Sequence, residues 1–162
     1  KGLLFSGTVK DNIAFCNPEM PFGKIERAAK IAEADGFIKE MPEKYNAPIS
    51  QGGKNVSGGQ HQRLCIARAV AADAEILVFD DSFSALDYKT DKKVRENLAA
   101  EAKGVTKVVV AQRIGTIMDA DLIVVLEDGK AVGQGKHAEL LKNCETYREI
   151  ALSQLSKEEL GL

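Results

Sequence analysis

Residues 76–79 (isoleucine, leucine, valine and phenylalanine) form an unbroken apolar run that ends abruptly at Asp80 and Asp81. A short run of this kind is typical of a β-strand covered on both faces. Two more β-branched runs follow at residues 107–111 and 122–126, and a helical pattern separates each run from the next. Strands that alternate with helices indicate a parallel sheet. The predicted fold class is therefore α/β.

The helices around these strands can be placed from apolar periodicity and end signals. Ser57 is a good N-cap, because its hydroxyl can accept a hydrogen bond from a free N–H of the first turn, and the helix that it opens is expected to end near Ala71. A charged amphipathic helix is predicted over residues 87–102. The other predictions are short helices over residues 8–15, 23–34 and 37–41, a loop over 46–55, a hairpin turn at 127–130 that leads into 131–135, and a helical tail over 138–155 that breaks near Asn143.

Charge and cysteine content exclude several classes of protein. The 22 Lys and Arg residues against 24 Asp and Glu give a formal net charge of −2, unlike a nucleic-acid polycation or an acidic disordered tail. No stretch approaches the ~20 consecutive apolar residues that a membrane-spanning helix needs. The three cysteines are widely spaced and odd in number, which argues against a disulfide framework and for a reducing compartment. At 162 residues, one packed domain is expected.

Asp80 and Asp81 form the first candidate site. The carboxyl edge of a parallel sheet is where open α/β folds bind ligands. One carboxylate there can hold a magnesium ion, usually through water, and its neighbour can orient or deprotonate an attacking water. A solvated turn after a strand is the other interpretation, and this fragment alone leaves both open.

The start of the helix that Ser57 opens is the second candidate site. Gly58 and Gly59 lie in its first turn, ahead of Gln60, and each glycine costs ~1 kcal/mol of helix stability relative to alanine. In return, an anion can approach the backbone N–H groups of a positive helix end closely. A glycine-rich connection is the alternative, and the triplet by itself does not separate the two.

The whole series of segments resembles the nucleotide-binding domain of ATP-binding cassette (ABC) transporters, over essentially the full chain and in the family's order. The segments that carry the resemblance are residues 55–60, 62–63, 66–69, 76–81, 84–87 and 111–113. Three further segments are similar to exporters: residues 4–13, residues 50–54, which in exporters contact the membrane domains, and residues 135–141, which enter the C-terminal helix.

The implied fold is an incomplete P-loop NTPase (RecA-like) parallel sheet with the ABC α-helical signature subdomain. The resemblance implies one partial ATPase domain over residues 1–162. Its signature subdomain would cover about residues 8–72, and the remainder of the RecA-like lobe with the C-terminal helices about 73–162.

The resemblance places one half of an ATP site at the helix start. In the family, a signature motif faces the γ-phosphate of the ATP that is held by the opposite subunit of a head-to-tail dimer. The residues that match this motif are Ser57, Gly58, Gly59 and Gln60, with Val56 in place of the usual leucine. Asp87 would end the D-loop, residues 84–87, which communicates across the dimer.

The residues that would form the chain's own ATP site depart from the family pattern. Asp80 matches the Walker B aspartate that serves Mg2+, but Asp81 stands where a catalytic glutamate is usual and Gln112 where a switch histidine is usual. Aspartate is one methylene shorter, so its carboxylate withdraws by ~1 Å and should slow proton abstraction from water. Glutamine cannot carry the positive charge of a protonated imidazole. We therefore expect a degenerate site beside an intact signature, as in one half of a heterodimeric exporter.

The phosphate-binding sequence Gly-x-x-x-x-Gly-Lys-Ser/Thr occurs nowhere in the 162 residues. In the family it lies upstream, and the first residue is Lys1 rather than methionine, so we expect a chain cut from a longer protein. We predict that these residues alone bind ATP poorly and do not hydrolyse it.

The complete protein is expected to be an ATP hydrolase at the cytoplasmic face of a plasma or inner membrane. Its partners would be transmembrane domains and a second ATPase domain, with no nucleic acid. Two alternatives stay open: a non-hydrolytic regulatory dimerisation module, and a soluble ABC ATPase of DNA repair or translation. The near-neutral charge and residues 5–13 disfavour the soluble alternative.

Overall fold

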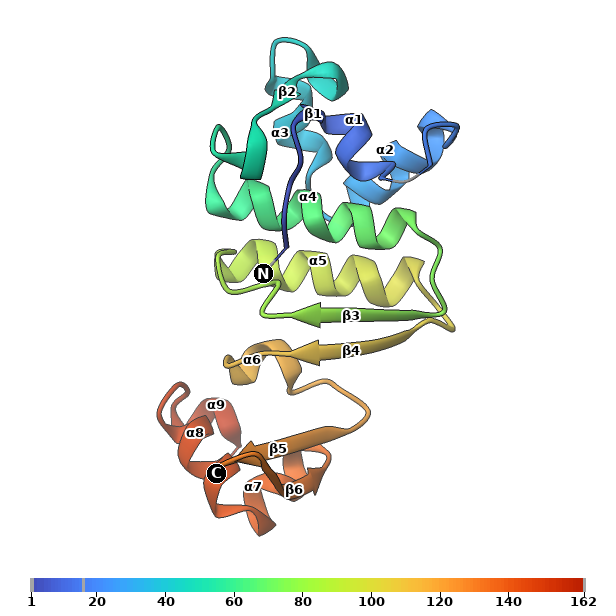
Figure 1. Cartoon of the computed structure of the whole chain (residues 1–162). Helices are drawn as coiled ribbons and strands as arrows, with labels where there is room; N and C mark the ends of the chain where they lie inside the picture. Colours follow the sequence, from blue (N-terminus) through green and yellow to red (C-terminus); the bar gives the residue numbers. More distant parts are fainter. Residues whose placement is uncertain (1, 16, 162) are drawn as a thin grey trace. The chain divides into compact units, whose positions relative to one another are not determined.

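The computed structural model describes residues 2–15 and 17–161 of the chain (Figure 1). It divides the chain into two compact units, Lys1–Val110 and Ala111–Leu162. Each unit has its own cluster of buried hydrophobic residues, and each is therefore described by itself.

The first unit contains a helical part followed by a small sheet. The helical part consists of β1 (Gly7–Thr8), α1 (Val9–Ile13), α2 (Phe22–Ile31), α3 (Asp35–Glu40), the 3-10 turn η1 (Lys44–Asn46), β2 (Pro48–Ile49), the 3-10 turn η2 (Gln51–Gly53) and α4 (Gly58–Ala71). The remainder consists of β3 (Ile76–Asp80), α5 (Tyr88–Glu101) and β4 (Thr106–Val110). The predicted loop over residues 46–55 thus contains a short strand, and β2 pairs antiparallel with β1.

Three helices of this unit begin at a residue whose side chain accepts a hydrogen bond from the first turn. Thr8 caps α1, Ser57 caps α4 and Asp87 caps α5. Such caps satisfy N–H groups that have no partner within the helix. The helix predicted to open at Ser57 and to end at Ala71 is confirmed.

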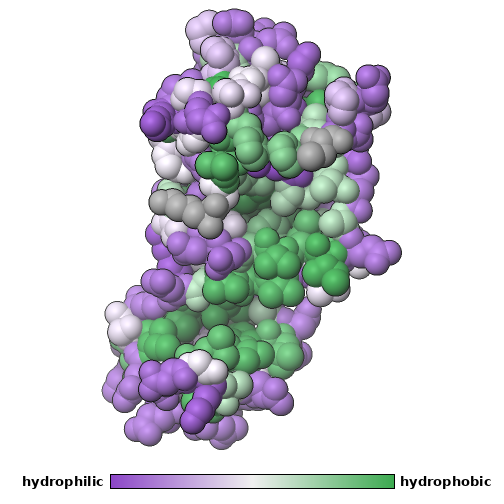
Figure 2. Space-filling model, in the orientation of Figure 1, coloured by the Kyte–Doolittle hydropathy of each residue, from purple (hydrophilic) through white to green (hydrophobic). Residues whose placement is uncertain are grey.

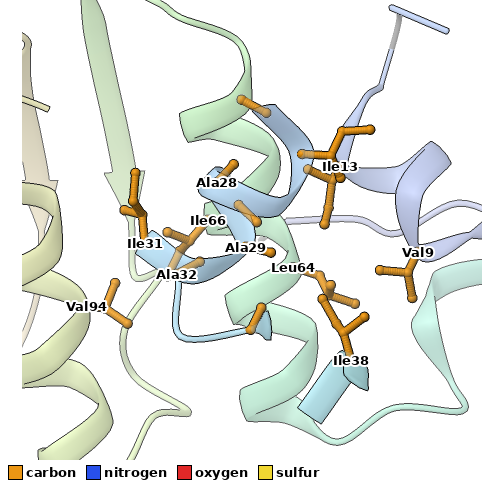
Figure 3. Packing of buried hydrophobic residues seen from close by; sticks show 14 of the residues in the cluster. Val9, Ile13, Ala28, Ala29, Ile31, Ala32, Ile38, Leu64, Ile66 and Val94 are labelled. Carbon is orange, nitrogen blue, oxygen red and sulfur yellow. The ribbon is translucent and has the colours of Figure 1, made fainter. Parts of the chain in front are cut away.

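Helices α2 and α4 form the centre of the first core (Figure 3). Ala28 and Ala29 of α2 and the residue that ends this helix, Ala32, are all buried. Their small side chains let α2 and α4 approach closely. Leu64 and Ile66 of α4 are at most 1% exposed in this contact. Truncation of a buried leucine or isoleucine typically costs about 2 to 5 kcal/mol, so this core fixes the position of α4.

Strands β3 and β4 form the predicted parallel sheet, with Ile76 opposite Thr106 and Asp80 opposite Val110. Helices α4 and α5 lie on one side of this pair (Figure 1). Leu77 and Phe79 are 5% and 2% exposed, whereas Ile76 and Val78 are 59% and 63% exposed.

The prediction that both faces of β3 are covered is therefore wrong for this chain. Successive side chains of a strand point to opposite faces, and the helices of the first unit cover one of them. Apolar side chains are exposed on both units (Figure 2), and on the other face of this sheet they include Val108 and Val110.

The second unit contains a hairpin and four helices among its described residues. They are α6 (Ile114–Ile117), β5 (Ile123–Glu127), β6 (Lys130–Gly135), α7 (His137–Asn143), α8 (Glu145–Leu152) and α9 (Lys157–Leu160). The predicted hairpin is confirmed: Asp128 and Gly129 both have positive φ, 48° and 75°, as a tight two-residue turn requires. Because β5 pairs antiparallel with β6, the parallel sheet in the described residues consists of β3 and β4.

The predicted helical tail and its break are also present, since α7 ends at Asn143 and α8 begins at Glu145. Within residues 2–15 and 17–161, no helix combines the length and the apolar character needed to cross a membrane. Of the three cysteines, Cys65 is half-buried and Cys144 is buried, which is typical of free cysteines that pack as small apolar side chains, and Cys16 lies outside the described residues.

Candidate functional site

The start of α4 is a reciprocal hydrogen-bonded cap. The Ser57 hydroxyl accepts from the Gln60 N–H at 3.2 Å, and the Gln60 side-chain oxygen accepts from the Ser57 N–H at 3.0 Å. The first turn of this helix contains no acidic side chain. Four of the predicted site residues, Ser57, Gly58, Gly59 and Gln60, therefore form one ordered turn at the positive end of a 14-residue helix.

The two glycines of this turn lie against Ala85, in the loop between β3 and α5. A Cβ added at Gly59 would lie 3.2 Å from the Ala85 carbonyl oxygen, and one added at Gly58 would lie 3.6 Å from the Ala85 Cβ. The contact at Gly59 is tighter than ordinary van der Waals contact, so a side chain there would push helix and loop apart. The sequence suggested anion access as the reason for these glycines, and this packing role was missed.

Asp80 and Asp81 lie where β3 ends, as predicted. Asp80 is exposed at the carboxyl end of the strand. Asp81 adopts a left-handed backbone conformation with φ of 48°, which aspartate tolerates better than most residues. Its N–H donates to the Val110 carbonyl at 3.0 Å, and its carboxylate Oδ2 accepts from the Ser84 hydroxyl at 3.0 Å. Both the main chain and the side chain of Asp81 are thus held in place.

The donor set at this strand end fits a magnesium ion that is bound mainly by water and phosphate. Magnesium commonly takes one or two protein carboxylates and completes its shell with water and substrate phosphate oxygens. Asp80 offers one exposed carboxylate at the carboxyl end of the sheet. In the described part of the chain, no cluster of three or more His, Cys, Asp and Glu side chains forms a complete metal cage.

Asp87 anchors the far end of the loop. Its carboxylate accepts hydrogen bonds from the Thr90 N–H at 3.0 Å and the Thr90 hydroxyl at 2.7 Å. These bonds hold the pKa of Asp87 below its usual value, with the bond from the Thr90 side chain as the main cause. In this structure Asp87 therefore serves as the cap of α5.

Gln62 connects α4 to the same loop, and sequence reasoning did not single it out. Its side-chain amide donates to the Asp81 carbonyl and to the Ser84 hydroxyl, both at 3.1 Å, and accepts from the Ala85 N–H at 2.8 Å. Only its place in the family-like series gave any indication of a role, because its partners are 19 to 23 residues away in sequence.

Arg68 ties the exporter-like segment near the N-terminus to α4. Its guanidinium donates to the Asn12 carbonyl, the Asn12 side-chain oxygen and the Leu3 carbonyl, at 2.8, 2.8 and 2.7 Å. It also lies over the rings of Phe5 and Phe15, which stack with centroids 4.9 Å apart. Asn12 is 2% exposed, and its buried amide is satisfied on both sides: Oδ1 accepts from Arg68, and Nδ2 donates to the Phe5 and Thr8 carbonyls.

Gln112 belongs to the second unit, where it is exposed. Its carbonyl accepts from the Gln154 side chain at 2.8 Å, and the same side chain accepts from the Ile114 N–H at 2.9 Å. Gln154 thus fixes the main chain on both sides of Arg113. The association of Gln112 with Asp81 that the family resemblance implies stays a prediction.

Of the eight predicted site residues, the first unit brings six together: four lie at the start of α4 and two, Asp80 and Asp81, at the end of β3. Asp87 lies at the end of the loop that connects β3 to α5. A glycine-rich helix start beside a carboxylate pair at the end of a parallel strand defines an α/β domain of the P-loop NTPase-like class. The chain belongs to the ABC transporter family: the family model of that description matches residues 3–84. It is part of an ATPase domain of the exporter type, as its relatives show.

Two relatives are translocation ATP-binding proteins of bacteria. The chain is 45% identical over 139 residues to the toxin RTX-I translocation ATP-binding protein of Actinobacillus pleuropneumoniae. The aligned residues cover 86% of this chain and 20% of that protein. It is 43% identical over 144 residues to the alpha-hemolysin translocation ATP-binding protein HlyB of Escherichia coli, or 89% of this chain and 20% of that protein. The chain therefore spans about one fifth of the length of these relatives.

A solved structure described as a bacterial Atm1-family ABC exporter with ATP bound has the same fold. It superposes with a TM-score of 0.88 at 35% sequence identity and covers 92% of this chain and 26% of that one. The likeness extends over almost the whole chain, so it supports both the fold class and the exporter type.

Proposed function

We propose that this chain is the signature-bearing part of an exporter ATPase domain, in a protein that couples ATP binding and hydrolysis to transport across a membrane. The observation that carries the proposal is the contact between the capped start of α4 and the loop that holds Asp81. In the proposed dimer, this contact would join residues of two different ATP sites. The helical signature subdomain corresponds to about residues 8–72 and the rest of the ATPase domain to about 73–162.

The start of α4 serves the ATP held by a partner domain. Ser57 and Gln60 hold each other in the cap, and the glycines between them add no side chain that would keep a phosphate away. Because the first turn lacks acidic residues, the positive helix end can favour the γ-phosphate. The partner is a second ABC ATPase domain in a head-to-tail arrangement.

The site that this chain shares through Asp80 and Asp81 is weakened. Asp80 supplies one carboxylate to Mg2+, which would neutralise phosphate charge there. The Asp81 carboxylate is shorter than glutamate, and the Ser84 hydroxyl already occupies one of its oxygens at 3.0 Å. Gln112 can donate only a neutral hydrogen bond to a phosphate. Nucleotide at this site is retained as a clamp, while turnover takes place at the other site of a heterodimer.

The complete protein carries transmembrane domains and works at the cytoplasmic face of a plasma or inner membrane, without a nucleic-acid partner. Membrane fractionation of the complete protein tests this localisation. Recovery in the soluble fraction would favour the alternative of a soluble ABC ATPase.

The degenerate site is tested by Asp81→Glu in the complete transporter with its partner. The longer side chain restores the reach of a general base, and we expect ATP hydrolysis at this site to rise by about tenfold or more, since positioned proton transfer contributes 10²- to 10⁴-fold. Asp80→Glu is the matched control: it lengthens the neighbouring carboxylate by the same methylene and should give no rise. Equal turnover in Asp81→Glu and wild type would contradict the degenerate site.

The regulatory dimerisation module is the second candidate, and the identities of Asp81 and Gln112 favour it. It predicts that the dimer binds ATP and that neither wild type nor Asp81→Glu hydrolyses it at either site. Steady-state ATPase rates measured together with nucleotide retention distinguish the two candidates.

A further inference from the structure

We propose that Gln62 is a positioning residue. It fixes the loop that carries Asp81 relative to residues 57–60 at the start of α4, called here the signature turn. The effect of Gln62 on catalysis rests on the proposed function, in which the turn and the loop belong to two ATP sites. The hydrogen-bonding part of the proposal stands on the structure alone.

One face of α4 is shaped to receive this loop. Gly58 and Gly59 precede Gln62 by four and three residues, so all three lie on the same side of the helix. The glycines bring the helix backbone close to Ala85: a Cβ added at Gly59 would lie 3.2 Å from the Ala85 carbonyl oxygen. Gln62 then reaches into the loop from the next turn.

A single side chain satisfies three groups of the loop. The Gln62 Nε2 donates to the Asp81 carbonyl and the Ser84 hydroxyl, and the Oε1 accepts from the Ala85 N–H. An amide is the side chain that offers a donor and an acceptor side by side. Glutamate lacks the donor when ionised, and methionine, of similar length, lacks both groups.

These contacts act on Asp81 by two routes. Gln62 binds the Asp81 carbonyl directly, and it binds Ser84, whose hydroxyl also donates to the Asp81 carboxylate at 3.0 Å. The Asp81 N–H is held independently by Val110. A shift of the signature turn therefore moves the carbonyl and the carboxylate of Asp81 about a fixed attachment to β4. Gln62 contacts no carboxylate oxygen of Asp81 and so acts by positioning.

Hydrogen exchange of the complete transporter tests the contact itself. In Gln62→Met, peptides that cover residues 82–86 should exchange at least about tenfold faster, because the Ala85 N–H loses its acceptor. In Gln62→Glu the acceptor remains, and exchange should stay near that of wild type above about pH 6, where the carboxylate is ionised. Gln134→Met is the control: Gln134 is exposed on β6, and its substitution should leave the loop unchanged.

Turnover tests the positioning role and is measured in the Asp81→Glu background. A misplacement of about 1 Å can cost 10²-fold, so we expect kcat at the site of Asp81 to fall about 10- to 100-fold in both Gln62 variants, with a change of less than about twofold in the KM for ATP. The rate of Gln62→Glu should partly recover as the pH falls toward about 5, because a protonated glutamate regains a donor, whereas Gln62→Met should not recover.

These measurements distinguish a failure of the Gln62 proposal from a failure of the proposed function. Unchanged exchange at residues 82–86 in Gln62→Met overturns the proposal whatever the ATPase rates are. Faster exchange with unchanged kcat in both variants overturns the positioning role. If wild type and Asp81→Glu show no turnover, the proposed function fails, and the exchange result still decides whether Gln62 holds the loop. A melting temperature near that of wild type for Gln62→Glu shows that its effect is not a loss of folding.

Discussion

Two helices of this chain begin with the same hydrogen-bonded turn, although they lie in different surroundings. At α4, Ser57 and Gln60 bind each other with bonds of 3.0 and 3.2 Å; at α9, Ser156 and Glu159 do the same with bonds of 2.9 and 3.2 Å. Both are capping boxes, a serine followed three residues later by glutamine or glutamate. The local cap chemistry of the candidate site is therefore ordinary.

The difference lies in what stands between and around the capping residues. In α4 the first turn has two glycines and no acidic side chain, and it packs on the loop at Ala85. In α9 the first turn contains Glu158 and Glu159, whose charges would repel an anion. The cap orders a helix start, whereas absence of negative charge and a close tertiary contact make one of the two starts suited to a phosphate.

The strongest test of this comparison replaces both cap serines with the same bulky residue. Ser57→Leu and Ser156→Leu each remove a cap hydroxyl, which typically costs about 1 kcal/mol of stability. Only Ser57→Leu also places a large side chain where the partner's phosphate is proposed to lie. We expect it to lower the ATPase rate of the complete transporter by about 100-fold, the scale of losing a preorganised contact to developing charge.

Ser156→Leu serves as the matched control in the same assay and should keep the wild-type rate. An equal loss in both variants would mean that the cap alone matters and would remove the distinction between the two helix starts. ATPase rates at saturating ATP, with unfolding curves of each variant, give the answer.

The second test compares two glycines in early helical turns. Gly36, in α3, has nothing within 4 Å of an added Cβ, whereas Gly59 has the Ala85 carbonyl oxygen at 3.2 Å. Gly36→Ala should stabilise the protein by up to about 1 kcal/mol, because alanine has less backbone freedom to lose. Gly59→Ala should instead destabilise it by about 1 kcal/mol, since overpacking outweighs helix propensity. Urea unfolding measures both, and a stabilised Gly59→Ala would show that the loop yields easily.

Local patterns in the sequence were enough to predict most elements of the fold. The cap at Ser57, the strand that ends at Asp80 and the hairpin turn at Asp128 and Gly129 are each determined by residues within a few positions. The antiparallel pairing of β5 with β6 follows from this turn. The pairing of β1 with β2 could not be predicted in this way, because about forty residues separate the two short strands and residues 46–55 have the pattern of a loop.

The candidate site was predictable only as a set of residues. Family-like spacing located Ser57 and Asp81, but the bonds of Gln62 span about twenty residues of sequence, and no periodicity reports them. Burial on both faces of β3 was a wrong prediction, because an apolar run shows that both faces prefer to be covered and says nothing about which elements cover them. Ile76 and Val78 remain exposed for this reason.

The test with the smallest expected effect compares how the caps of α4 and α9 respond to a fall in pH. The cap of α9 depends on an ionised carboxylate: hydrogen bonds from the Ser156 N–H and hydroxyl lower the pKa of Glu159 below its usual value, with the backbone bond as the main cause. A carboxyl whose pKa is lower in the folded state contributes stability above its unfolded pKa, about 4.3, and that contribution is lost as the pH falls through the lowered folded pKa. The cap of α4 depends on the uncharged amide of Gln60, so it should not titrate.

We therefore expect the amide resonance of Glu159 to shift in NMR spectra as the pH is lowered from 6 to about 3.5, while that of Gln60 stays constant until the protein unfolds. Glu159→Gln should abolish the shift at α9, and Gln60→Glu should create one at α4. The second substitution also places a negative charge in the turn that is proposed to meet a phosphate, so it should weaken nucleotide binding at the partner's site at neutral pH and less so in acid. An unchanged affinity in Gln60→Glu would mean that the absence of acidic residues from the first turn of α4 has no electrostatic role, and the two helix starts would then differ only in packing.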